Sequence, residues 1–282
     1  MTDNAPQQTA PYPQFVSASF SHAMLMMLRR RRVVLAAALV LSPVIVPLAL
    51  AFLSATAFAE DGNRIFVYLV ENLYLQAMAP LLALFFGCML IGEDVESETI
   101  PYLLTRPLPR SAIVIGRFFA YLVVASTILI ASIGMLFAAC TSLGNLNFSR
   151  ETALLLAHYA GVAVLALLSY GALAVFLGTL MKHPVIAGIL FIFGWQRLAL
   201  YIPGAADFLT IEKYLLAILP KLATERENAV VRTALVEFEK QQLLVAASTA
   251  LLGLAAVAII LVGASCLVVR WREYSAARAV GG

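Results

Sequence analysis

Residues 33–54 have the sequence VVLAAALVLSPVIVPLALAFLS, which contains no charged side chain. An α-helix rises about 1.5 Å per residue, so this run is long enough to cross a bilayer core about 30 Å thick. Because lipid offers the backbone no hydrogen-bond partners, only helices or closed barrels span membranes, and an unbroken apolar run is typical of a helix. The stretch therefore predicts a membrane-spanning helix, which Pro43 and Pro47 are expected to kink.

Further long apolar runs follow along the 282 residues of the chain. The predicted spans are 33–54, 66–92, 112–139, 152–181, 185–202 and 243–269. The composition agrees, since 62% of the residues are hydrophobic and 12% are charged, whereas a soluble domain is about half apolar and a quarter charged. We therefore expect an all-α integral membrane protein with six transmembrane helices in a lipid bilayer. The modest net charge of +3 gives no argument for a nucleic-acid partner.

Polar segments surround the predicted transmembrane domain, residues 33–270. Residues 1–14 are rich in Pro, Gln and small polar groups, which is typical of a disordered tail, and residues 271–282 form a second tail. Residues 15–32 place apolar side chains at helical spacing before a run of arginines, which predicts an amphipathic elbow helix in the headgroup layer. Residues 203–242 carry mixed charges, and we expect a loop with one or two short helices on the membrane face.

Arginine and lysine residues near the ends of the spans predict the orientation. These residues are Arg29–Arg32, Arg106, Arg110, Arg117, Lys182, Arg270, Arg272 and Arg278. With six spans they all fall on one side, which predicts a multi-pass protein of the cell inner (cytoplasmic) membrane with both termini in the cytoplasm and the 203–242 loop outside. A cleavable signal peptide is the alternative for the first span, because Ala57-Phe58-Ala59 resembles a cleavage site, but the apolar run is longer than a typical signal core.

The connection between the second and third spans, residues 92–117, has the sequence GEDVESETIPYLLTRPLPRSAIVIGR. Its acidic residues are Glu93, Asp94, Glu96 and Glu98. Ser97 or Thr99 can cap a short helix here, and Pro107 ends it because proline cannot donate to the helical ladder. We expect a rigid helix at about 94–106, acidic at its positive N-terminal end and basic at its C-terminal end, which docks on a soluble partner. An ordinary solvated loop is the alternative.

The residues from Glu96 to Arg110 follow the pattern E-x-E-T-I-x-x-L-L-T-R-P-L-P-R. This pattern resembles the cytoplasmic loop of ABC-2 type permeases, the membrane subunits of ABC exporters, and in particular it is similar to the nitrous-oxide-reductase maturation permease group. Gly116-Arg117 stand where the family has Gly-Lys at the start of its third span. Two departures, Glu98 in place of the usual Gly and Pro101 after the Thr-Ile, affect where the coupling helix begins.

The resemblance implies a permease that works as a homodimer with two copies of a separate ABC ATPase subunit, which binds ATP and Mg. It implies no cofactor and no catalytic or metal site in this chain. The residues implied to couple to the ATPase are Glu93, Asp94, Glu96, Glu98, Thr99, Leu103, Leu104, Arg106 and Arg110. The sequence agrees with the need for a partner, since it contains no GxxxxGK[ST] phosphate-binding motif. A non-transporting scaffold or sensor that docks a soluble partner through residues 92–110 remains the alternative.

The ionisable side chains Glu71, His158 and Arg197 lie in the outer parts of the predicted spans. Such groups are costly in lipid and are therefore functional candidates. Counting about 1.5 Å per residue places all three at a similar depth near the outer face. We hypothesise that Glu71 and Arg197 form an ion pair and line a cavity; the alternative is that all three extend to the headgroups without partners. The few charges in the spans favour an apolar, lipid-like or peptide cargo, or force transmission to an extracytoplasmic partner at loop 203–242.

Overall fold

The computed structural model describes residues 12–54, 62–88, 90, 110–141, 148–181, 183–201, 210–219, 231–233, 236–238 and 246–271. In chain order its α-helices are α1 (Tyr12–Met27), α2 (Arg30–Leu41), α3 (Ile45–Ser54), α4 (Gly62–Leu69), α5 (Ala79–Gly87), α8 (Arg110–Thr141), α9 (Arg150–Leu180), α10 (Pro184–Ile189), α11 (Gln196–Tyr201), α12 (Ile211–Ile218) and α13 (Ala247–Trp271). A 3-10 turn, η1 (Ser42–Val44), joins α2 to α3. Two π-helical segments, η2 (Val70–Met78) and η3 (Leu190–Trp195), join α4 to α5 and α10 to α11.

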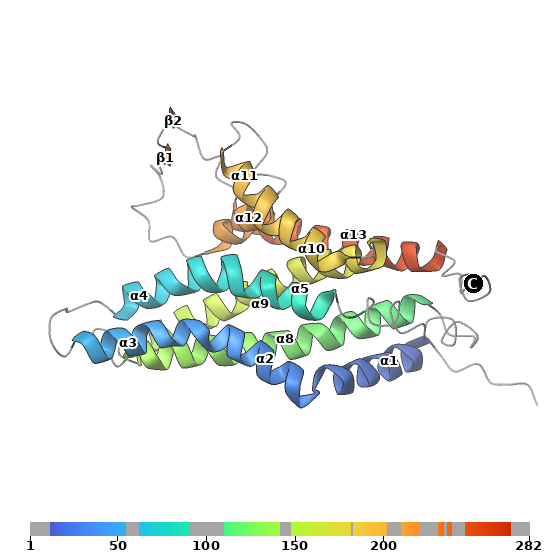
Figure 1. The fold of residues 1–282 in the computed structure, drawn as a ribbon, viewed down its shortest axis with the longest axis horizontal. Helices are drawn as coiled ribbons and strands as arrows, with labels where there is room; N and C mark the ends of the chain where they lie inside the picture. The colour runs from blue at the N-terminus through green and yellow to red at the C-terminus, as the bar shows by residue number, and fades with distance from the viewer. Residues whose placement is uncertain are drawn as a thin grey trace, which may run out of the picture.

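The described helices confirm the all-α membrane fold class. Five of them are long and apolar enough to cross a membrane: Arg30–Phe52, Gly62–Gly87, Ser111–Thr141, Arg150–Leu180 and Ala247–Trp271. The predicted fifth span, 185–202, coincides with α10, η3 and α11, which follow one another from Pro184 to Tyr201. Its apolar part, Pro184–Trp195, is shorter than the other spans, so the count of six stays a prediction. Figure 1 shows the long helices side by side, with α1 and the end of α13 at the same end of the bundle.

Local sequence signals explain where several helices bend or begin. Pro43 lies in the η1 turn, so the predicted kink of the first span occurs where proline removes a helical donor. Ser149 and Thr152 form a capping box at the start of α9, in which each side chain satisfies the other residue's backbone N–H. Pro184 opens α10, a position where its missing N–H costs nothing.

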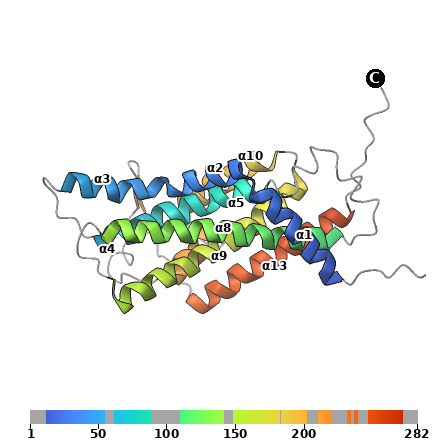
Figure 2. The same ribbon diagram turned by 90° about the horizontal axis from the view of Figure 1, so that it is seen from below.

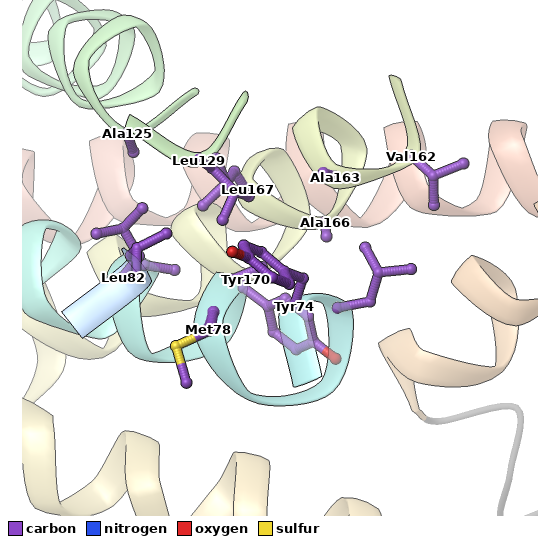
Figure 3. Packing of buried hydrophobic residues seen from close by; sticks show 14 of the residues in the cluster. Tyr74, Met78, Leu82, Ala125, Leu129, Val162, Ala163, Ala166, Leu167 and Tyr170 are labelled. Atoms are coloured by element: carbon purple, nitrogen blue, oxygen red, sulfur yellow. The ribbon is translucent and has the colours of Figure 1, made fainter. Parts of the chain in front are cut away.

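Helix α9 occupies the centre of the bundle and carries small residues where its neighbours come close. A Cβ added at Gly171 would clash with the ring of Tyr121 from α8, whose hydroxyl donates to the Leu167 carbonyl oxygen at 2.9 Å. On α5, a Cβ added at Gly87 would lie 2.7 Å from the Cβ of Ala174. Small residues therefore let α5 and α8 approach α9 closely, as is common between membrane helices. Figure 3 shows the buried core at this level, with Leu167 and Tyr170 of α9 among its residues.

The two predicted polar segments agree with the structure in part. Helix α1 begins at Tyr12, inside the predicted disordered tail at 1–14, and it ends at Met27, before the end of the predicted elbow at 15–32. The early end follows because Arg29 is extended (ψ 124°) and Arg30 already belongs to α2. Its position in the headgroup layer stays a prediction. In loop 203–242 the structure contains the expected short helix, α12, but also a hairpin of two short antiparallel strands, β1 (Val231–Thr233) and β2 (Val236–Phe238), which the sequence pattern did not predict.

Candidate functional site

Arg117 lies about two turns inside α8, at the end of the bundle where α1 crosses this helix (Figure 2), which we call the α1 end. Its side chain is only 7% exposed. The guanidinium Nη1 donates to the backbone oxygen of Leu90, just beyond the end of α5. Carbonyl groups at a helix C-terminus lack partners within the helix and favour a nearby cation. Arg117 therefore holds the exit of the second span against the third.

Gly116, the neighbour of Arg117, brings α8 close to α1. A Cβ added at Gly116 would lie 2.6 Å from the carbonyl oxygen of Val16 and 2.8 Å from the Cβ of Ser19. The hydroxyl of Ser19 donates to the Ile113 carbonyl oxygen at 3.1 Å. We call the contacts of Gly116 and Arg117 with α1 and with Leu90 the α1 junction. It joins α1, the exit of the second span and the start of the third.

The α1 junction flanks the predicted coupling segment. The coupling residues Glu93, Asp94, Glu96, Glu98, Thr99, Leu103, Leu104 and Arg106 lie outside the residues that the structure describes. Arg110 begins α8, but its side chain is outside the described part as well. The coupling helix at 94–106 therefore stays a prediction. Arg117, by contrast, entered the sequence argument as a flanking base, and the structure places it inside the bundle at the base of this segment.

Glu71 is buried in the π-helical segment η2, with 8% of its surface exposed. Its Oε1 accepts a hydrogen bond of 3.0 Å from the hydroxyl of Tyr159 on α9. The Tyr159 ring packs edge-on against Phe66, with ring centroids 5.9 Å apart. A carboxyl group held in this way is satisfied inside the bundle and does not extend to the headgroups. π-Helical turns are rare and are frequent at functional sites, which strengthens Glu71 as a candidate.

The other two ionisable candidates do not join Glu71 within the described side chains. His158 is exposed, and its Nε2 lies 3.0 Å from the carbonyl oxygen of Ile218 at the end of α12. The structure therefore gives His158 and Glu71 separate partners. Arg197 belongs to α11, and its side chain lies outside the described part, so its ion pair with Glu71 stays a hypothesis.

The structure also contains buried polar contacts that sequence reasoning missed. Tyr170 on α9 donates to Oε1 of Gln196 at 3.2 Å, and Gln196 is 3% exposed. The Tyr74 hydroxyl lies 2.6 Å from Oγ of Ser132, which donates to the Val40 carbonyl oxygen at 2.8 Å. Figure 3 shows the rings of Tyr74 and Tyr170 together in the core. The sequence does contain one indication of these contacts. Tyr159 and Tyr170 are about three turns apart, so their side chains lie on one face of α9.

The chain matches a known family over nearly its whole length. A family model described as ABC-2 family transporter protein matches residues 2–271, a range that includes every described helix. No curated protein matches the chain. Within the described residues, no group of three or more His, Cys, Asp or Glu side chains is placed to hold a metal ion. The resemblance to the nitrous-oxide-reductase maturation group stays a prediction. The chain belongs to the ABC-2 transporter family.

Proposed function

We propose that this chain couples ATP hydrolysis by a separate ATPase subunit to export of a substrate, or to force transmission, across the membrane. Its family membership makes it the permease component of an ABC transporter, and ABC-2 family permeases generally pair with an ATPase subunit. The match over residues 2–271 is the observation that carries the proposal. The chain has no GxxxxGK[ST] motif, so the partner ATPase would bind ATP and Mg.

The α1 end is the cytoplasmic end in this proposal. Arg30 opens α2 there, and Arg270 lies in the last turn of α13; both side chains are exposed. Basic residues beside the spans favour the cytoplasmic side of a bacterial-type inner membrane. Both termini then lie in the cytoplasm, with α10 to α11 as the fifth of six crossings. Leu90 and Arg110, the described residues on either side of the coupling segment, lie at the same end.

Two copies of the permease and two of the ATPase form the working unit in this proposal. When the ATPases close on ATP, they push on the coupling helix at 94–106 and rock the spans of each copy. Export then proceeds at the interface of the two copies. A ligand shifts the equilibrium between an open and a closed ATPase pair only if it binds one of them more tightly. ATP must therefore bind the closed pair more tightly than the open pair. An apolar or lipid-like cargo suits spans that contain few charged residues.

A pull-down tests this proposal. The chain, tagged at its C-terminus, is solubilised from native membranes and purified, and the copurifying proteins are identified and assayed for ATPase activity. We expect an ATPase in about equal amount, which is lost when Glu96 and Leu103 are both replaced by Ala. The matched control replaces Glu151 and Leu154, an exposed acidic and an exposed leucine side chain at the start of α9, by Ala and should retain the ATPase. Recovery with only non-ATPase partners would support the scaffold alternative.

A further inference from the structure

We propose that Gly116 and Arg117 form the joint between the coupling segment and the spans. In this role Arg117 is a positioning residue that fixes the exit of the second span to α8, and Gly116 seats α1 on the same helix. The inference rests on the proposed function and deepens it, because it names the described residues through which the 91–109 segment moves the bundle.

The burial of Arg117 is the first argument. A long cationic side chain near the end of a membrane helix lowers its free energy by extending toward water. Arg117 instead stays 7% exposed and donates to Leu90, itself 7% exposed, at the start of the segment. A guanidinium has five N–H donors and is costly to bury unless they find acceptors. Such a group is placed where a fixed geometry matters, and here it fixes the point at which the coupling segment leaves the second span.

The close approach of α1 is the second argument. A Cβ at Gly116 would lie 2.6 Å from the Val16 carbonyl oxygen and 3.0 Å from the backbone nitrogen of Phe20. These are backbone atoms, so they cannot move aside by a side-chain rotation. The hydroxyl of Tyr12 lies 3.1 Å from Oγ of Ser111 and adds a contact near the start of α8. Helix α1 is therefore seated on the first turns of α8 along much of its length.

The spacing of the two residues explains how one short stretch joins three elements. Successive residues of an α-helix point about 100° apart, so Gly116 and Arg117 face two different neighbours. The 91–109 segment connects Leu90 to the start of α8, and Arg117 links these two ends directly. A push on the segment then moves the second span, the third span and α1 together. Without the link, the second span and α8 keep their contact through Tyr74 and Ser132, but the end of the second span at Leu90 is no longer fixed to α8.

Titration of the partner ATPase tests the joint. The permease is reconstituted in lipid nanodiscs, and the ATPase that copurifies with it is added while its Kd and the ATP turnover at saturation are measured. We expect Arg117→Met to raise the Kd about tenfold, because an unpositioned segment must be ordered at the moment of binding. Saturating ATPase should not restore the wild-type turnover of the complex. Arg117→Lys keeps a cationic donor and should stay within about threefold of the wild-type Kd.

Two further variants separate positioning from general damage. Gly116→Ala leaves Arg117 in place but displaces α1. Like Arg117→Met, it should lower the ATP turnover at saturating ATPase below the wild-type value. Arg150→Met removes an exposed arginine at the opposite end of the bundle and should change neither quantity. If Arg117→Met gives no monodisperse protein, Arg117→Gln and Gly116→Ala carry the test. A wild-type Kd and turnover in the Arg117 and Gly116 variants would contradict the proposed joint. If the wild-type permease binds no ATPase, both the proposed function and the joint are contradicted.

Discussion

Substitution of Gly171 by Ala tests the close packing of α8 on α9. A Cβ at this position would overlap the ring of Tyr121, which is fully buried and hydrogen-bonded to Leu167. Added atoms in a well-packed core cost about 1–3 kcal/mol through side-chain and backbone shifts. Displacement of the ring also breaks the Tyr121 hydrogen bond, and such bonds within membranes contribute about 0.6 kcal/mol on average. We expect Gly171→Ala to destabilise the folded permease by about 2–3 kcal/mol.

Reversible unfolding in mixed micelles of increasing SDS content measures this free energy. Tyr121→Phe is the control for the hydroxyl group and should cost only about 0.6 kcal/mol. Tyr121→Leu removes the ring, so adding Gly171→Ala to it should cost less than in the wild-type background. This non-additivity is the decisive result, because residues in contact are energetically coupled. Equal costs of Gly171→Ala in both backgrounds, or a wild-type stability of the single variant, would refute the clash.

Three further predictions concern the polar contacts. Tyr159→Phe should lower the free energy of unfolding by about 1 kcal/mol. In a Glu71→Leu background, where the acceptor of the Tyr159 hydroxyl is absent, the loss should be smaller. Equal losses in the two backgrounds would show that the Tyr159–Glu71 hydrogen bond contributes nothing. The charge exchange Glu71→Arg with Arg197→Glu should recover permease-dependent ATP turnover that either single change abolishes, whereas no recovery contradicts the ion pair. His158→Ala should speed amide hydrogen exchange in α12 about fivefold, since its contact with Ile218 contributes about 1 kcal/mol; unchanged exchange would mean that α12 is held by its apolar contacts alone.

The spans could be predicted from the sequence because lipid imposes one rule on every backbone group. Apolar length located the five long helices, and Pro43 marked the bend in the first of them. The start of α9 was predicted near residue 152, and the capping box of Ser149 and Thr152 explains why it begins at Arg150. These features depend on residues close together in the chain, which a sequence pattern records directly.

Features that depend on contacts between helices could not be predicted in this way. The π-helical segment around Glu71 was not predicted, because its sequence VENLYLQAM mixes apolar residues with Glu71, Asn72 and Gln76 in no spacing that marks a π turn. The tyrosines of α9 resemble ordinary core or interface residues until their acceptors, Glu71 and Gln196, are known. Hydropathy measures how much a side chain prefers lipid, and it does not indicate the neighbour that satisfies its polar atom.

Arg117 shows the same limit and its consequence for orientation. In the sequence, Arg117 lies near the start of an apolar run and resembles the other bases that flank the spans. Its buried guanidinium donates to the Leu90 carbonyl oxygen, so it contributes to packing and little to the charge that faces the headgroups. The exposed Arg30 and Arg270 at the same end still favour a cytoplasmic α1 end without Arg117. Arg30 and Arg270 are exposed beside the spans, whereas Arg117 acts through the bundle, so its substitution should alter coupling while the orientation is unchanged.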